Sequence, residues 1–306
     1  MKKIAMVGLG RMGGNMARRL QQGGAEVVAH NRNFAVTQQL AGETGLVAVE
    51  TLQQLVDSLG DGPRIIWLML PAGDATQQTL EGLTPMLGAG DIVVDGANAF
   101  YKDSQRRARD LEAWGIQFVD VGVSGGVWGL QNGYAMMVGG EPGAVKQLEP
   151  YLKILAPAPD KGWLHCGPAG AGHFVKMIHN GIEYGMMQAF AEGFALMKGK
   201  QEFDLDLAAI AEMWRHGSVV RSWLLDLSAD FLQQDQNLGA IAPFVSDSGE
   251  GRWTAFEAIE QGVPAPVMSL ALMMRFASQG SNDFPARMLA MMRKGFGGHA
   301  IKEGIK

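Results

Sequence analysis

The sequence predicts an α/β fold, in which a Rossmann-like, doubly wound parallel sheet is followed by a second, all-helical domain. Short apolar strands alternate with helical stretches over the first half of the chain, which is typical of a parallel sheet covered by helices on both faces. After about residue 168 only helical spacing continues. The length of 306 residues suits two domains, which we expect at 1–168 and 169–306.

The elements of the first domain follow from its apolar runs and from the glycines between them. Five strands are expected, at Lys3–Val7, Glu26–Ala29, Arg64–Leu70, Ile92–Asp95 and Phe118–Val121. Helical stretches lie between them, at Met12–Gln22, Thr51–Leu59 and Ser104–Trp114. Glycine pairs such as Gly23-Gly24 and Gly139-Gly140 separate elements and indicate helix ends and turns.

The second domain is expected to begin with one long helix. The run from Gly172 to about Lys198 contains no proline, and at a rise of about 1.5 Å per residue it would be roughly 40 Å long. It is apolar almost all round, which indicates a buried helix. Further helices are expected at Leu205–His216, Ser222–Gln234, Trp253–Gln261 and Ala265–Gln279.

The composition argues against several classes of protein. The formal net charge of −5 and the pI near 5.7 disfavour non-specific binding to nucleic acid or to an anionic membrane. No apolar run approaches the roughly 18 residues that span a bilayer, and the first residues show no signal-peptide pattern. The single Cys166 excludes an intramolecular disulfide. We therefore expect a cytoplasmic protein in which an anionic substrate would meet a local cluster of cations.

A glycine-rich motif, Gly8-Leu9-Gly10-Arg11-Met12-Gly13, directly follows the first strand and opens a helix. The first glycine makes the tight turn, the second lets the backbone approach a pyrophosphate, and the third allows close packing of helix on strand. The phosphates would lie at the helix N-terminus, where N–H groups and the helix dipole favour anions. The motif therefore predicts dinucleotide binding, although the same pattern alone can be a plain glycine turn.

The end of the second strand indicates which dinucleotide is bound. An acidic residue there usually holds the ribose 2′-hydroxyl of NAD, whereas an arginine accommodates the 2′-phosphate of NADP. The sequence His30-Asn31-Arg32-Asn33 has no carboxylate, so Arg32 favours NADP. The alternative is that Arg32 only stacks on the adenine and that NAD is also accepted. The expected cofactor-binding residues are Gly8, Leu9, Gly10, Arg11, Met12, Gly13, Asn31, Arg32, Asn33, Leu70 and Asn98.

Two further loops follow buried strands at the edge of the sheet where α/β folds bind ligands. Asp95-Gly96-Ala97-Asn98 presents an amide, and Ser124-Gly125-Gly126 presents a hydroxyl and unobstructed backbone N–H groups. Either could equally be a polar loop without a ligand. We interpret both as candidate substrate loops.

The long helix contains the most informative pattern. Lys176, His179, Asn180, Glu183 and Tyr184 stand at i, i+3, i+4, i+7 and i+8 and so share one face. Burial of lysine and glutamate is costly unless they are paired or functional. A structural lysine–glutamate pair is one interpretation. The functional one is a lysine base, whose pKa falls on desolvation, and a glutamate acid, whose pKa rises on burial.

Basic residues of the second half are candidates for binding an anion, because arginine can hold a phosphate through two hydrogen bonds. They are Arg252, next to Trp253 and Thr254, then Arg275, and the C-terminal Arg293 with His299. The alternative is that they are scattered surface charges.

Taken together, these residues resemble the decarboxylating 6-phosphogluconate dehydrogenases, in the shorter form of that family. The resemblance covers nearly the whole chain and is most specific from Gly170 to Tyr184, GAGHFVKMIHNGIEY. It implies oxidation of 6-phosphogluconate at C3, loss of carbon dioxide and formation of ribulose 5-phosphate with reduction of NADP or NAD. It also implies a homodimer or homotetramer. We expect no metal, because a β-keto acid loses carbon dioxide readily once its carbonyl oxygen is protonated.

The resemblance assigns a role to each candidate residue. Lys176 would be the general base for the 3-hydroxyl and later the acid at the carbonyl oxygen, and Glu183 would protonate C1 of the enediol. The residues expected to hold the sugar acid are Asn98, Ser124, Gly125, Gly126, His179, Asn180 and Tyr184. Those expected near its phosphate are Arg252, Thr254 and Arg275, with Arg293 and His299 usually contributed by the neighbouring subunit.

Three departures from the family pattern and two alternatives remain. Asp-Gly-Ala-Asn replaces Asp-Gly-Gly-Asn, Arg252 stands where the long forms have lysine, and the chain lacks much of their duplicated helical domain. One alternative is another β-hydroxyacid dehydrogenase, although these generally lack the His-Asn-Gly-Ile-Glu-Tyr continuation. The other is a catalytically silent NADP-binding regulator, which would be expected to lose Lys176 or Glu183.

Overall fold

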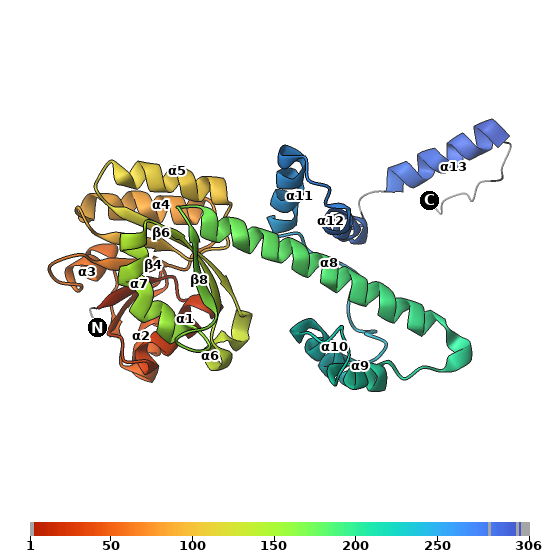
Figure 1. Ribbon diagram of the computed structural model, residues 1–306, viewed down its shortest axis with the longest axis horizontal. Coiled ribbons are helices and arrows are strands. Elements are labelled where there is room, and N and C mark those ends of the chain that lie inside the picture. Colours follow the sequence, from red (N-terminus) through yellow and green to blue (C-terminus); the bar gives the residue numbers. More distant parts are fainter. Residues whose placement is uncertain (1–2, 281–282, 298–299, 301–306) are drawn as a thin grey trace. The chain divides into compact units, whose positions relative to one another are not determined.

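The fold is described from a computed structural model, which covers residues 3–280, 283–297 and 300. The chain divides into two compact units, Met1–Ile178 and His179–Lys306, which we describe separately (Figure 1). The division falls inside the long helix α8 (Ala171–Gly199). The domain boundary expected at 168/169 stays a prediction.

The first unit is built on one eight-stranded sheet of order β3-β2-β1-β4-β5-β6-β7-β8. The strands are β1 (Ile4–Val7), β2 (Val27–His30), β3 (Val47–Ala48), β4 (Ile65–Leu68), β5 (Ile92–Asp95), β6 (Gln117–Ser124), β7 (Ala135–Gly140) and β8 (Trp163–Gly167). This confirms the Rossmann-like sheet and all five expected strands; β3, β7 and β8 were not predicted.

The sheet is not wholly parallel, which corrects the prediction in one place. Strands β1 to β6 are parallel, but β7 runs antiparallel to β6, with Val121 opposite Val138. Residues 125–134 connect these two strands. A parallel pair needs a crossover of about a dozen residues or more, so this connection is too short to bring β7 back in the same direction.

Helices cover both faces of the sheet because each strand alternates its side chains between them. Ile4 and Met6 of β1 belong to the core on one face, whereas Ala5 and Val7 belong to the core on the other. The first face is covered by α1 (Arg11–Gln22), α2 (Phe34–Thr44) and α7 (Pro142–Leu155). The second is covered by α3 (Leu52–Asp57), α4 (Asp74–Leu83) and α5 (Tyr101–Glu112).

The strand order places the ligand edge of this sheet. The chain winds from β1 to β3 in one direction and then from β4 outward in the other, so the topological switch lies between β1 and β4. In open α/β sheets ligands bind at the carboxyl ends of the strands at such a switch. The loops that follow β1 and β4 therefore flank the expected dinucleotide site.

The described part of the second unit is helical, as expected. Its further helices are α9 (Leu207–Arg215), α10 (Trp223–Gln234), α11 (Glu250–Gln261), α12 (Pro266–Ser278) and α13 (Asp283–Gly297). The N-terminus of α9 is capped by Asp206 and that of α10 by Ser222, each accepting a backbone N–H. A core of Leu207, Ala211, Leu225, Ala229 and Leu232 packs α9 against α10.

The expectation that the long helix is buried all round is wrong for the single chain. Ile182, Met186 and Leu196 of α8 are 53%, 40% and 77% exposed. The apolar residues of this helix predicted burial, but a sequence pattern does not show whether another element covers each of them. In the described residues, no helix is both long and apolar enough to cross a bilayer.

Candidate active site

The glycine loop after β1 has the geometry that the motif predicts. Gly8 has φ +92°, and a Cβ added there would overlap the Met69 carbonyl oxygen. A Cβ on Gly13 would overlap the Gly8 carbonyl oxygen, so α1 packs closely on the strand. A Cβ on Gly10, in contrast, would meet no atom of the described chain within 4 Å. The loop thus has open space at the glycine that is expected to face a pyrophosphate.

The N-terminus of α1 fits an anion as well. No side chain caps it, and its first turn contains no acidic residue. Arg11, the first helical residue, and Arg32, just after β2, are both exposed. These features fit the phosphates of a dinucleotide, since backbone N–H groups at a helix start favour anions.

Asn31 and Asn33 brace the glycine loop. The Leu9 N–H donates to Asn31 Oδ1 at 3.1 Å, and Asn31 Nδ2 donates to the Asn33 carbonyl at 3.2 Å. Asn33 also caps α2 by accepting the Ala35 N–H at 3.2 Å. The two asparagines therefore hold the loop in shape, whatever contact they make with a cofactor.

The loops after β4 and β5 lie at the same edge of the sheet. Leu70 is half-buried, and a Cβ on Gly8 would come within 2.9 Å of its Cδ2 atom, so Leu70 borders the glycine loop. Asn98 is exposed, and the turn before it is held by Asp95, whose Oδ1 accepts the Ala97 N–H at 3.0 Å. Leu70 and Asn98, which were expected from the sequence to bind the cofactor, thus lie at the carboxyl edge of the sheet.

The Ser124-Gly125-Gly126 loop rests on a buried tyrosine. Gly125 and Gly126 have φ of +138° and +52°, values that favour glycine. A Cβ on Gly129 would overlap the ring of Tyr134, and one on Gly125 would lie 3.1 Å from that ring. Burial raises the pKa of Tyr134 to about 12. The uncharged ring therefore packs beneath a loop whose backbone conformation favours glycine.

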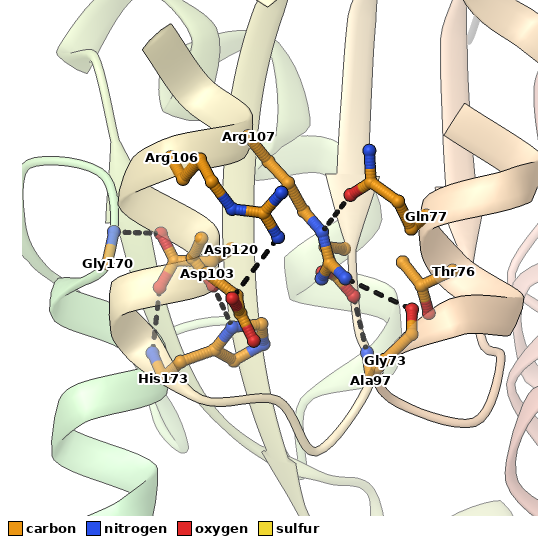
Figure 2. A network of polar contacts seen from close by, with 12 residues as sticks. Gly73, Thr76, Gln77, Ala97, Asp103, Arg106, Arg107, Asp120, Gly170 and His173 are labelled. Atoms are coloured by element: carbon orange, nitrogen blue, oxygen red, sulfur yellow. Dashed lines mark hydrogen bonds and ion pairs between the residues drawn. The ribbon is translucent and has the colours of Figure 1, made fainter. Parts of the chain in front are cut away.

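Lys176 is held against the sheet by close backbone packing. Its side chain is 7% exposed, and a Cβ on Gly122 of β6 would overlap the Cβ of Lys176. Figure 2 shows that Asp120 of the same strand accepts the N–H groups of Gly170 and His173, at 2.6 and 2.7 Å. Lys176, in the second turn of α8, therefore lies against β6, the strand that leads to the Ser124 loop.

A second contact fixes the same helix start. The His173 ring is 1% exposed, and its Nδ1 atom is hydrogen-bonded to the Ser104 hydroxyl of α5 at 2.6 Å. Both partners are buried. The beginning of α8 is therefore attached to β6 by Asp120 and to α5 by His173.

In the second unit, His179, Asn180 and Glu183 lie together on α8. His179 Nδ1 is 3.1 Å from Asn180 Oδ1 and 3.8 Å from Glu183 Oε2. The Glu183 side chain is 39% exposed, so the expectation that it is a buried carboxyl is wrong for this chain. The helix buries Asn180 but leaves Glu183 half-exposed, because the two lie three residues apart on adjacent parts of its surface.

Tyr184 is the centre of a polar cluster in the second unit. Its hydroxyl lies 3.2 Å from Ser248 Oγ and donates to Glu250 Oε2 at 3.4 Å. The guanidinium of Arg275 lies 3.5 Å from the centre of its ring. Burial, with a smaller effect of Glu250, raises the pKa of Tyr184. The hydroxyl therefore keeps its proton and remains a donor at neutral pH.

The other predicted phosphate residues are placed as follows. Arg252 forms an ion pair with Asp247 and lies 4.5 Å from the ring of Phe276. Thr254 is buried and its hydroxyl donates to the Glu250 carbonyl of its own helix at 2.9 Å. Arg293 is exposed on α13, and His299 lies outside the described residues.

Several residues around these sites were not predicted from the sequence: Asp95, Ser104, Arg107, Asp120, His173, Ser248 and Glu250. A signal existed for two of them. Asp95 ends an apolar strand and Asp120 interrupts another, and a carboxylate buried in a sheet requires donors. Their partners come from distant segments, which strand patterns do not identify.

Comparison with known proteins identifies the family. The family model described as the NAD binding domain of 6-phosphogluconate dehydrogenase matches residues 3–166. The model for the C-terminal domain of 6-phosphogluconate dehydrogenase matches residues 172–292. The chain belongs to the 6-phosphogluconate dehydrogenase family. The expected family, fold and class of NAD(P)-dependent dehydrogenase are thereby confirmed.

Individual relatives agree with this assignment. The chain is 42% identical to the NAD⁺-dependent, decarboxylating 6-phosphogluconate dehydrogenase of Haloferax volcanii, over 98% of both chains. It is 36% identical to the NADP⁺-dependent, decarboxylating enzyme of Bacillus subtilis, covering 90% of this chain and 61% of that one. The solved 6-phosphogluconate dehydrogenase of Plasmodium falciparum matches with a TM-score of 0.83 and 27% identity, over 99% of this chain and 67% of that one.

A substitution in the glycine loop should weaken cofactor binding without lowering the stability of the fold. Gly10→Ala should fold with the stability of the wild type, because φ −63° and ψ −175° suit alanine and the added Cβ meets no protein atom within 4 Å. It should weaken dinucleotide binding by roughly tenfold or more, because the Cβ occupies the space expected for a pyrophosphate. Fluorescence titration with reduced cofactor measures the affinity, and urea unfolding measures the stability.

Gly13→Ala is the matched comparison, because its Cβ overlaps the Gly8 carbonyl oxygen. That variant should lose stability by about 1–3 kcal/mol, as overpacked sites do. Unchanged cofactor affinity in Gly10→Ala would contradict the assignment of this loop.

Proposed function

We propose that this protein catalyses the oxidative decarboxylation of 6-phosphogluconate to ribulose 5-phosphate and carbon dioxide, with reduction of NADP, and of NAD more weakly. The observation that carries the proposal is the buried Lys176, packed on Gly122 of β6 at the strand that leads to the Ser124 loop. The relatives named for this reaction, which match nearly the whole chain, support it.

Lys176 acts twice in the proposed reaction. When bound, the nicotinamide ring supplies the chemistry of hydride acceptance from C3 of the sugar acid. Lys176 removes the proton of the 3-hydroxyl as that hydride leaves, which gives the 3-keto acid. Lys176 then returns the proton to the carbonyl oxygen while the bond from C1 to C2 breaks and carbon dioxide departs. A desolvated lysine suits this exchange because burial favours its neutral form.

Glu183 completes the reaction by giving a proton to C1 of the enediol, the carbon that was C2 of the sugar acid. Lys176, neutral again after decarboxylation, takes the proton of the adjacent enol hydroxyl as the ketose forms and then releases it to solvent. The Glu183 carboxyl group is half-exposed and 3.8 Å from His179, so it can recover a proton from solvent between turnovers. His179 and Asn180 lie beside it and are proposed to hold the hydroxyl groups of the sugar acid. Asn98, Ser124, Gly125 and Gly126 are proposed to do the same from the sheet edge.

The phosphate is proposed to bind to the cluster around Tyr184. The Tyr184 hydroxyl is a donor, and Arg275 lies over its ring. Arg252 is paired with Asp247, so phosphate binding would exchange a carboxylate for a phosphate at that guanidinium. Thr254, Arg293 and His299 are proposed to contribute, the last two from a neighbouring subunit.

The most direct test is the reaction itself. Purified protein should reduce NADP with 6-phosphogluconate and release one carbon dioxide for each cofactor reduced, and EDTA should leave the rate unchanged because proton transfer to the keto oxygen is sufficient for decarboxylation. Absorbance at the reduced nicotinamide band and trapping of labelled carbon dioxide measure the two products. Turnover only with non-phosphorylated β-hydroxyacids would overturn the proposal, and cofactor binding with no turnover on any sugar acid would favour a silent regulator.

The roles on α8 are tested by two substitutions with controls on the same helix. Lys176→Met should abolish oxidation and spare cofactor affinity, and Glu183→Gln should slow turnover by roughly 10²–10⁴-fold, the usual contribution of a general acid. Lys198→Met and Glu192→Gln are matched controls at exposed positions of α8 and should change the rate less than twofold or so. Retained turnover in Lys176→Met, or an unchanged rate in Glu183→Gln, contradicts the corresponding role.

The preference for NADP is proposed to depend on Arg32, which is exposed just after β2 where an arginine accommodates a 2′-phosphate. Arg32→Ala should raise the KM for NADP by roughly tenfold, the value of one charge-assisted contact, and change the KM for NAD much less. Steady-state rates with each cofactor at saturating substrate measure this. An equal loss for both cofactors would indicate that Arg32 only stacks on the adenine.

We also propose a homodimer or homotetramer. Ile182, Met186 and Leu196 are exposed and recur on one face of α8, and such exposed apolar faces mark association sites. Native mass spectrometry should give two or four times the chain mass of 32.8 kDa. Leu196→Glu should weaken the assembly, because it places a charge in the proposed contact. A fully active monomer would contradict this proposal.

A further inference from the structure

A buried ion pair lies at the edge of the sheet that carries the candidate site. Arg107 of α5 and Asp95, the last residue of β5, are 2.9 Å apart, and their side chains are 2% and 0% exposed. Burying two charges costs more free energy than their attraction usually returns. A buried ion pair is therefore weak evidence for a gain in stability. The other hydrogen bonds of Asp95 and Arg107 show which parts of the chain the pair holds together.

Asp95 controls the loop that carries Asn98. One carboxylate oxygen accepts the Ala97 N–H at 3.0 Å, and the other accepts from Arg107 at 2.9 Å. Gly96, between Asp95 and Ala97 in sequence, has no room for a side chain, because a Cβ there would overlap the Trp67 indole nitrogen. The turn from β5 to Asn98 is thus fixed by a carboxylate whose direction Arg107 sets.

Arg107 also holds the neighbouring loop, between β4 and α4. Figure 2 shows its guanidinium beside Gly73, to whose carbonyl oxygen Nη2 donates at 3.3 Å. Its Nε donates to Gln77 Oε1, also at 3.3 Å. Gly73 precedes α4 with φ +88°, and it ends the short loop that begins after Leu68 and includes Leu70. One guanidinium therefore joins the two loops that carry Leu70 and Asn98.

A second arginine–aspartate pair lies at the opposite, amino ends of strands β4 and β5. Arg64 precedes β4 and Asp91 precedes β5, and their side chains are 3.2 Å apart. Asp91 also accepts the N–H groups of Arg64 and Gly88, both at 2.8 Å. The Arg64 side chain is 25% exposed and that of Asp91 3%, and the pair lies at the amino ends of the strands, away from the candidate site. It provides an internal control for what such a pair contributes to stability alone.

We propose that Arg107 is a positioning residue for hydride transfer. Acting through Asp95 and Gly73, it sets the distance between the loop after β4, which borders the cofactor, and the Asn98 loop, which meets the substrate. The inference rests on the proposed function for its substrate. A fork of planar N–H donors is required, because three acceptors at different directions share one group, and lysine offers a single point charge instead.

The test compares Arg107→Lys with Arg64→Lys, with urea unfolding of each variant to measure its stability. Arg107→Lys should lower kcat by about tenfold or more, because small misplacements of reacting groups are costly. It should leave the KM for 6-phosphogluconate within about threefold, and it should raise the isotope effect of 3-deuterated substrate, since the hydride step becomes slower than other steps. It should also raise the dissociation constant of NADPH roughly threefold. Arg64→Lys should change none of these, and the urea unfolding of both variants separates a kinetic effect from a loss of stability.

Gln77→Ala is a milder variant that keeps the ion pair and removes one acceptor of Arg107, so it remains informative if Arg107→Lys does not fold. It should lower kcat in the same direction by roughly two- to threefold, as loss of one hydrogen bond suggests. The proposal is overturned if Arg107→Lys or Gln77→Ala keeps wild-type kcat and isotope effect, or if Arg64→Lys gives the same kinetic change. If the wild type does not oxidise 6-phosphogluconate, the proposed function fails by itself, and the NADPH affinities of the variants still decide whether Arg107 positions the loop after β4.

Discussion

The candidate site depends on the hydrogen bonds that the Asp120 carboxylate accepts from the start of α8. This carboxylate lies in the middle of β6, where it accepts the N–H groups of Gly170 and His173. These N–H groups have no partner within a helix, and the negative charge suits the helix dipole. Because β6 continues to the Ser124 loop and α8 continues to Lys176, this carboxylate places a loop and a side chain relative to each other.

Glycines make that contact possible. A Cβ on Gly172 would overlap the Met137 carbonyl oxygen, and one on Gly139 would lie 2.5 Å from Asp120 Oδ1. With Gly122 under Lys176, these positions let the helix backbone approach the strands directly. Such close packing of backbone on backbone leaves α8 little freedom to slide along the strands. The position of the Lys176 backbone is therefore fixed by the packing of α8 on the sheet. The same logic applies to Arg107, whose rigid guanidinium joins loops that would otherwise be independent.

The sequence was informative where structure is local. The glycine loop, all five expected strands and the face of Lys176 on α8 follow from spacing within one segment. The partners of Asp120 and Arg107 could not be predicted, because Asp120 lies 50 residues from Gly170 and Arg107 lies 34 from Gly73. The exposure of Glu183 was mispredicted for a related reason: helical periodicity shows which residues share a face but not what covers that face. The antiparallel direction of β7 follows from the short connection between β6 and β7. The pattern of apolar residues within each strand does not show that length.

Asp120 holds α8 on β6 and thereby places Lys176 for proton transfer. The decisive measurement is kcat for 6-phosphogluconate oxidation by Asp120→Asn, alongside its affinity for NADPH. An asparagine oxygen can accept one of the two N–H groups, but its amide nitrogen would face the other donor. In this variant kcat should fall roughly tenfold or more, while cofactor affinity should stay within about twofold because the glycine loop is braced separately by Asn31. Wild-type kcat in a folded Asp120→Asn protein would contradict this role of Asp120.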